Sequence, residues 1–186
     1  SKHQAVMYHL RLAMQEGRNQ YAPMQGTPEL RAAIADKTAL SYGARPDAAT
    51  EITVTSGASE AIFCAILSVV GAGDEVIVLD PCYDLYEPAV ALAGGACVHV
   101  PLRALDFSID WHRLRSAVTP RTRLIIVNSP HNPTGAVWAA ADVAQLAALT
   151  RGTGILVLAD EVYEHIVYDG RRHESVLRNT ELAARS

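Results

Sequence analysis

The segment Asn128–Gly135, NSPHNPTG, has a composition that packing alone does not explain. Two prolines bracket Asn132 and restrict the backbone around it, and Gly135 allows the chain to turn out again. A rigid loop that presents one side-chain amide is typical of a site where that amide forms a hydrogen bond with a ligand. The alternative, a structural turn built on the asparagine, accounts for the prolines but not for the segment as a whole.

A second polar segment, Asp160–Glu164, follows the apolar run Ile155–Leu158. A carboxylate at the buried end of a central strand must be paired, because otherwise it takes up a proton. For Asp160, a ligand with a basic ring nitrogen and a structural arginine are equally good partners. Glu161 and His165 are four residues apart and could share a metal ion, but no third ligand is evident, so we expect solvated side chains there.

The segment Ser56–Glu60, SGASE, joins a predicted strand to a predicted apolar helix. Its small residues expose backbone N–H groups at the positive end of the helix dipole, where an anion can bind, and Ser59 could add a hydroxyl donor. An ordinary tight turn explains the same residues. The segment is not a P-loop, because no lysine followed by serine or threonine comes after it.

These polar segments lie between elements that alternate along the chain. Strands are predicted at Glu51–Thr55, Glu75–Leu79, Ala96–Pro101, Leu124–Val127 and Ile155–Leu158. Helices are predicted at 4–16, 27–42, 58–70, 85–92, 110–117 and 139–150. The helix at 58–70 is apolar nearly all round, so we expect it to be buried.

Strands that alternate with helices predict an α/β fold in three layers, with a mostly parallel sheet and helices on both faces. Ligands of such sheets bind beyond the carboxyl ends of the strands. The segments at those ends are 56–60, 80–84, 128–135 and 160–163, which are the polar, glycine-containing or aromatic parts of the chain. Nothing marks a linker, so residues 1–186 are predicted to form a single domain.

Composition narrows the class of protein. The 186 residues carry a net charge of −4, which argues against a general affinity for nucleic acid or for anionic membranes. No apolar run approaches the roughly 20 residues that span a bilayer, and the first residues do not resemble a secretory signal. Cys64, Cys82 and Cys97 form no zinc-binding or CxxC spacing, so we expect free thiols in a cytoplasmic protein.

Taken in order, the segments SGASEA, DPCYDLY, NSPHNPTG and DEVYEH resemble those of the class I aminotransferases of fold type I, which use pyridoxal phosphate. The resemblance covers essentially the whole chain, including the stretch NQYAPMQGTPELR, and its NPTG and DEVY segments are highly specific. Within the group, the chain is more similar to methionine-preferring and kynurenine aminotransferases than to the aspartate enzymes. Residues 1–186 would then be a cofactor-binding large domain, incomplete and without the small C-terminal domain.

The resemblance implies roles for four residues around the cofactor ring. Asp160 matches the carboxylate that pairs with the ring nitrogen and keeps it protonated, so that the ring can accept electrons. Asn132 and Tyr163 match the two groups that hydrogen-bond to the phenolic oxygen. Tyr83 matches the aromatic residue that stacks on the ring, an arrangement that contributes roughly 0.5–1.5 kcal/mol beyond burial.

The resemblance also assigns residues to the cofactor phosphate. Gly57, Ala58 and Ser59 match the turn that binds it. Tyr21 matches a tyrosine that reaches across a dimer interface to the partner's phosphate, which implies a homodimer. Taken singly, Tyr83 could be a core aromatic, Tyr21 a loop residue and Ser59 an ordinary helix N-terminal residue.

The chain departs from the family in one respect that matters for catalysis. Relatives use a lysine that follows the DEVY segment to form a Schiff base with the cofactor, whereas the lysines here are Lys2 and Lys37, both earlier in the chain. Lys37 lies on a predicted helix and is expected to be solvated. We therefore expect no catalytic residue in the chain and no turnover by the chain alone, which would be a piece of a longer enzyme, one part of a split enzyme or a non-catalytic binder.

The activity implied for the parent enzyme is amino-group transfer from an L-amino acid, methionine or an aromatic one, to a 2-oxo acid. A pyridoxal-phosphate-dependent C–S lyase or synthase would use the same ring-binding residues. A ligand-sensing module is the alternative outside enzymology, although no DNA-binding segment or basic patch favours it.

Overall fold

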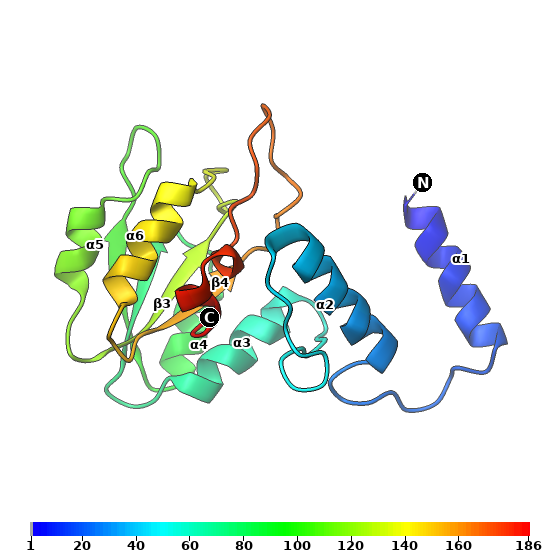
Figure 1. Ribbon diagram of the computed structural model, residues 1–186. Helices are drawn as coiled ribbons and strands as arrows, with labels where there is room; N and C mark the ends of the chain where they lie inside the picture. The colour runs from blue at the N-terminus through cyan, green and yellow to red at the C-terminus, as the bar shows by residue number, and fades with distance from the viewer. Residues whose placement is uncertain (1) are drawn as a thin grey trace.

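In the computed structural model, which describes residues 2–186, four parallel strands form one sheet (Figure 1). The strands are β1 (Glu75–Asp80), β2 (Ala96–Pro101), β3 (Thr122–Asn128) and β4 (Leu156–Asp160), in the order β2-β1-β3-β4. Asn128 is in register with Asp160, so the two polar segments that follow β3 and β4 begin side by side.

Helices cover both faces of the sheet and confirm the predicted three-layer α/β fold. The helices are α1 (Lys2–Gln15), α2 (Pro28–Tyr42), α3 (Ala58–Val69), α4 (Tyr86–Leu92), α5 (Trp111–Ala117), α6 (Ala140–Thr150) and α7 (Thr180–Ala183), with a short 3-10 helix η1 (Val176–Arg178). One face packs against α5, α6 and α7, and the other against α3 and α4. None of the helices in the described part of the chain is long and apolar enough to cross a membrane.

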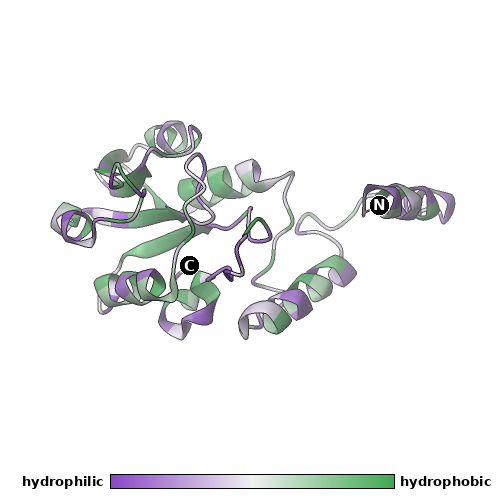
Figure 2. Ribbon diagram, turned by 90° about the horizontal axis from the view of Figure 1, so that it is seen from above, coloured by the Kyte–Doolittle hydropathy of each residue, from purple (hydrophilic) through white to green (hydrophobic). Residues whose placement is uncertain are grey.

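The core explains why the strands are nearly continuous apolar runs. Successive side chains of a strand point to opposite faces, and both faces are covered here. In β3, Leu124 and Ile126 enter the cluster beneath α3 and α4, whereas Ile125 and Val127 enter the cluster beneath α5 and α6. Figure 2 shows the sheet as the most hydrophobic part of the ribbon.

The strand predicted at Glu51–Thr55 is wrong, because the segment pairs with no strand among the described residues. Its Val54 N–H donates instead to the carbonyl of Gln25 at 2.9 Å. Gly26 makes this approach possible, because it has φ +97° and an added Cβ would lie 2.6 Å from Val54 Cγ2. An apolar, β-branched pattern predicts an extended backbone, but a sheet also requires a neighbouring strand.

The prediction that the helix at 58–70 is buried on all sides is also wrong. Ile62 and Ile66 of α3 face the core, but Leu67 is 43% exposed and Cys64 is exposed. The apolar composition therefore does not correspond to burial on every face of this helix. The helix α1 lies apart from the sheet in both views (Figure 1, Figure 2), and its apolar side chains are exposed as well.

Helix α2 is attached to the segment after β4 by charged and polar side chains. The ammonium of Lys37 and the hydroxyl of Tyr42 both donate to the carboxylate of Glu164. The guanidinium of Arg178 lies 5.4 Å from the centre of the Tyr42 ring. Lys37 was expected to be solvated, but its charge is paired, because Glu164 meets it from a segment far away in the sequence.

At the amino end of the central strand β1, Glu75 accepts hydrogen bonds from Thr119 and Arg121, the latter with an Nε–Oε1 distance of 2.9 Å. The hydrogen bond from Thr119, followed by that from Arg121, lowers the pKa of Glu75 below its ordinary value of 4.5.

On the α3 and α4 face, burial, followed by the nearby Asp80 carboxylate, raises the pKa of the Cys82 thiol to about 12. The three cysteines are free thiols, as expected.

Candidate functional site

A cavity of about 170 Å³ lies beyond the carboxyl ends of β3 and β4, at the N-terminus of α3. Residues from four separate segments of the chain line it: Ala58, Ser59, Ile62, Tyr83, Asn132, Asp160, Val162 and Tyr163. The structure therefore places most of the candidate ligand-binding residues around one small volume.

Asn128, the last residue of β3, holds two sides of this cavity together. It is 4% exposed, and its Nδ2 donates to the carbonyl oxygen of Asp160 at 2.7 Å. Its Oδ1 accepts a hydrogen bond from the backbone N–H of Asn132, also at 2.7 Å. One buried amide thus links the loop after β3 to the end of β4. Sequence reasoning did not single out Asn128, although its place at a strand end was a usable signal.

The rest of the loop after β3 is held by its own hydrogen bonds. Gly135 has φ +74°, and its N–H donates to the carbonyl of His131 at 2.8 Å. The ring of His131 is buried, with Nδ1 2.7 Å from the hydroxyl of Thr134, and burial lowers the pKa of this histidine. The loop is therefore held by hydrogen bonds within itself, and Asn132 lines the cavity.

Asp160, which ends β4, is 9% exposed and faces the cavity. Its Oδ2 accepts a hydrogen bond from the hydroxyl of Tyr86 at 2.7 Å, and its Oδ1 accepts one from the N–H of Val162 at 3.3 Å. Within residues 2–186, no arginine or lysine forms an ion pair with it. The carboxyl group is thus oriented by neutral donors, and the structural-arginine alternative is wrong for the described residues.

Two further polar groups at the cavity have no partner in the part of the chain that the structure describes. Neither the side-chain amide of Asn132 nor the hydroxyl of Tyr163 hydrogen-bonds to another protein group there. Tyr163 is 37% exposed and extends from the segment after β4. A buried carboxylate flanked by an amide and a phenol is therefore available to a ligand.

The N-terminus of α3 closes the cavity on another side. Gly57 precedes the helix with φ +86°, and Ala58 and Ser59 line the cavity. The hydroxyl of Ser59 lies 3.5 Å from that of Tyr83. The N–H of Ser56 already donates to the carboxylate of Glu60, so that group is occupied within the chain.

Glu161, next to Asp160, has a structural environment of its own. Its Oε2 lies 3.0 Å from Nε2 of the buried His173, and its Oε1 accepts a hydrogen bond from the N–H of Val176 at 2.9 Å. It is therefore not the solvated side chain that the sequence led us to expect, whereas His165 is exposed. No cluster of three or more metal-ligating side chains occurs among the residues described.

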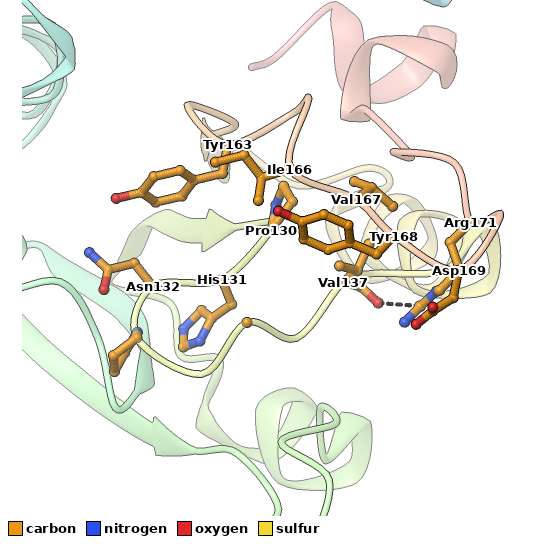
Figure 3. A pocket seen from close by; sticks show the side chains of 12 residues that line it. Pro130, His131, Asn132, Val137, Tyr163, Ile166, Val167, Tyr168, Asp169 and Arg171 are labelled. Atoms are coloured by element: carbon orange, nitrogen blue, oxygen red, sulfur yellow. Dashed lines mark hydrogen bonds between the residues drawn. The ribbon is translucent and has the colours of Figure 1, made fainter.

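A larger cavity of about 480 Å³ adjoins the first and shares Asn132 and Tyr163 with it. It lies between the loop after β3 and the segment 163–171, as Figure 3 shows. Arg171 closes its far side by donating to the carbonyl oxygen of Val137 at 2.7 Å.

Tyr21 and Lys37 lie outside both cavities. The side chain of Tyr21 is fully exposed, so its predicted contact with a partner subunit stays a prediction. Gly57 precedes the cavity wall without lining it.

The family model for class I and II aminotransferases matches residues 2–184 of the chain. The chain belongs to this family.

Individual relatives are similar over nearly all of the chain. A methionine aminotransferase of Escherichia coli is 48% identical over 171 residues, which cover 92% of this chain and 44% of the relative. A probable N-succinyldiaminopimelate aminotransferase of Mycobacterium tuberculosis is 48% identical over 163 residues, 87% of this chain and 41% of the relative. The chain thus spans less than half the length of these curated relatives.

Solved structures show the same fold. An Escherichia coli protein with a methionine aminotransferase function superposes with a TM-score of 0.94 at 47% identity, over 96% of this chain and 47% of that one. An aromatic aminotransferase of Pyrococcus horikoshii superposes with a TM-score of 0.94 at 37% identity, over 98% of this chain and 49% of that one. These likenesses confirm the fold type I assignment.

Proposed function

We propose that the protein transfers an amino group from an L-amino acid to a 2-oxo acid with pyridoxal phosphate, and that these residues form the cofactor-binding part. The observation that carries the proposal is the cavity in which the carboxylate of Asp160, the amide of Asn132, the phenol of Tyr163 and the ring of Tyr83 meet. Membership of the aminotransferase family supports it.

The residues of the cavity fit pyridoxal phosphate group by group. A volume of about 170 Å³ is smaller than the roughly 300 Å³ at which pockets for drug-sized ligands begin, so it suits one small ring. The buried carboxylate of Asp160 is matched to a protonated ring nitrogen. The unpartnered amide of Asn132 and hydroxyl of Tyr163 are matched to the phenolic oxygen, and the ring of Tyr83 to the ring face.

The phosphate would bind where α3 begins. The N-terminus of a helix presents unpaired N–H groups and a positive dipole end to an anion. Gly57, Ala58 and Ser59 provide this environment, and the hydroxyl of Ser59 is at hand as a further donor. Binding of phosphate would compete with Glu60, whose carboxylate accepts the N–H of Ser56.

Pyridoxal phosphate, when bound, supplies an electron-accepting ring that stabilises the negative charge left when the substrate Cα loses its proton. The protein's part is to hold the ring and its protonation state. Asp160 keeps a proton on the ring nitrogen, Asn132 and Tyr163 donate to the phenolic oxygen, and Tyr83 fixes the plane of the ring.

The proton transfer at the substrate Cα would need a lysine from outside these residues. The sequence contains Lys2 and Lys37 only. The ammonium of Lys37 pairs with Glu164 and is not part of the cavity wall. We propose that a further segment supplies the lysine and the small domain, and that a second subunit of a cytoplasmic homodimer receives the exposed Tyr21 at its cofactor phosphate.

Methionine or an aromatic amino acid is the proposed amino donor. Two relatives support this choice: a methionine aminotransferase at 48% identity and a structurally similar aromatic aminotransferase at 37%. The test uses protein expressed from its complete reading frame, pyridoxal phosphate, methionine or phenylalanine, and pyruvate. We expect alanine to form in proportion to the 2-oxo acid derived from the donor, and Asp160→Ala to abolish the reaction.

A thiol and ammonia from methionine, in place of alanine, would instead favour the C–S lyase. Borohydride reduction followed by mass spectrometry identifies the lysine that carries the cofactor. A cofactor adduct on Lys37 or Lys2 would contradict the proposal that the catalytic lysine comes from a segment outside residues 1–186.

A further inference from the structure

Tyr86 was not among the residues singled out by the sequence, but it contacts two walls of the cavity at once. It is the first residue of α4 and is 2% exposed. Its hydroxyl donates to Oδ2 of Asp160 at 2.7 Å. Its ring lies edge-to-face against that of Tyr83, with 5.7 Å between ring centres and an interplanar angle of 82°.

The hydrogen bond sets the orientation of the carboxylate. Among the described residues, the other oxygen of Asp160 accepts only the longer hydrogen bond from Val162 N–H, at 3.3 Å, so Tyr86 supplies the shorter of the two restraints. A hydroxyl orients a carboxylate without cancelling its charge, whereas an arginine or lysine at the same place would neutralise it. The carboxylate is therefore held in place without an ionic partner among the described residues, and it can pair with a cationic group in the cavity.

The ring contact acts on the second wall. Edge-to-face aromatic pairs have a preferred geometry, so a buried Tyr86 ring restricts the tilt of the Tyr83 ring. Burial, followed by the hydrogen bond to Asp160, raises the pKa of Tyr86 well above its ordinary value, so that its hydroxyl stays protonated and remains a donor.

We propose that Tyr86 is a positioning residue that orients the Asp160 carboxylate and the Tyr83 ring together, so that the cavity selects an aromatic ring with a protonated nitrogen. This inference rests on the proposed function, because pyridoxal phosphate is the ring concerned. The inference adds that the preference of the cavity for a positively charged ring depends on Tyr86, which does not line the cavity.

The test compares two ligands with the protein expressed from its complete reading frame. One is pyridoxal phosphate, and the other is its 1-deaza analogue, in which a CH group replaces the ring nitrogen. For Tyr86→Phe, which keeps the aromatic ring and removes the hydroxyl, we expect pyridoxal phosphate to bind about tenfold more weakly, as for the loss of a hydrogen bond to a charged group. Binding of the deaza analogue should stay within about twofold, because it makes no bond to Asp160.

Further variants separate positioning from simple loss of structure. Tyr86→Leu removes the ring contact as well and should weaken both ligands. Tyr42→Phe removes a hydroxyl that donates to a different carboxylate, that of Glu164, and should leave both affinities unchanged.

Each remaining outcome has a definite meaning. Equal losses of affinity for both ligands in Tyr86→Phe, or no loss for either, would overturn the positioning role. Failure of the unaltered protein to bind pyridoxal phosphate would overturn the proposed function, and this inference with it.

Discussion

Replacing Asn128 by alanine should destabilise the protein and weaken cofactor binding together. The substitution removes the donor to the Asp160 carbonyl and the acceptor for the Asn132 N–H, each at 2.7 Å. The Asp160 carbonyl keeps a second donor, the N–H of Ser129 at 3.2 Å. Losing the hydrogen bond from Asn128 to this carbonyl should therefore cost about 1 kcal/mol, the low end of the range for an unsatisfied group. The Asn132 N–H has no other acceptor among the described residues, and its loss should cost about 2 kcal/mol.

The sum, about 3 kcal/mol, is a large part of the roughly 5–15 kcal/mol that stabilises a typical protein. For a protein of this size it corresponds to a fall in the midpoint of thermal unfolding of roughly 6–12 °C. Thermal unfolding measures the stability, and equilibrium dialysis measures the affinity for pyridoxal phosphate. Asn128→Asp retains an acceptor for Asn132 but places an oxygen against the Asp160 carbonyl, so it should not restore the wild-type midpoint.

A matched control is Asn179→Ala. The side chain of Asn179 caps α7 by accepting hydrogen bonds from the N–H groups of Glu181 and Leu182 at 3.0 and 3.1 Å, and Asn179 lines neither cavity. Its loss should cost about 1 kcal/mol and leave the affinity for pyridoxal phosphate unchanged. If Asn128→Ala instead unfolds at the wild-type temperature and binds the cofactor as tightly, the bridging role assigned to Asn128 is refuted.

Three further predictions concern other parts of the molecule. Hydrogen bonds from Thr119 and Arg121 lower the pKa of Glu75 in the folded protein below 4.5. The ionised Glu75 side chain therefore stabilises the folded state above pH 4.5, and this stabilisation is lost as the pH falls through the lowered pKa. Unfolding titrations between about pH 6 and pH 3 should therefore show a smaller loss of stability for Glu75→Gln than for the wild type, and parallel curves would contradict this. The pKa of the Cys82 thiol is raised to about 12, so little of the reactive thiolate is present at pH 8. Cys82 should therefore react with iodoacetamide far more slowly than a cysteine in a short peptide, and the two rates should become equal when the protein is unfolded in guanidinium. Gly26→Ala should lower the midpoint of unfolding more than Gly17→Ala, because both have positive φ but only the first adds a clash; equal shifts would count against the close approach of Gly26 to Val54.

Much of the fold followed from patterns that act over short distances. The central strands β1 and β3 are largely apolar and buried, and the alternation of strands with helices was enough to predict a parallel sheet. The failures came from the tertiary context. Residues 51–55 have a strand pattern but no neighbouring strand among the described residues, and the apolar α3 has a partner on one face only.

The candidate site divides in the same way. Asn132, Asp160 and Tyr163 could be identified because their segments have a characteristic composition at strand ends. Asn128 and Tyr86 were missed, because their roles depend on partners 32 and 74 residues away in the sequence. Lys37 was misjudged for the same reason: its partner Glu164 is 127 residues further along the chain.

The adjacent positions of Asp160 and Glu161 also limit where insertions and deletions can occur in the gene. One carboxylate serves the cavity, and the next is held by His173 and the N–H of Val176. A single-residue insertion or deletion within β4 would turn the Asp160 side chain away from the cavity, because neighbouring residues of a strand point to opposite faces of the sheet. Codon insertions should therefore be tolerated at the exposed tip, residues 169–172, where loops generally accept them, and selected against at 160–164.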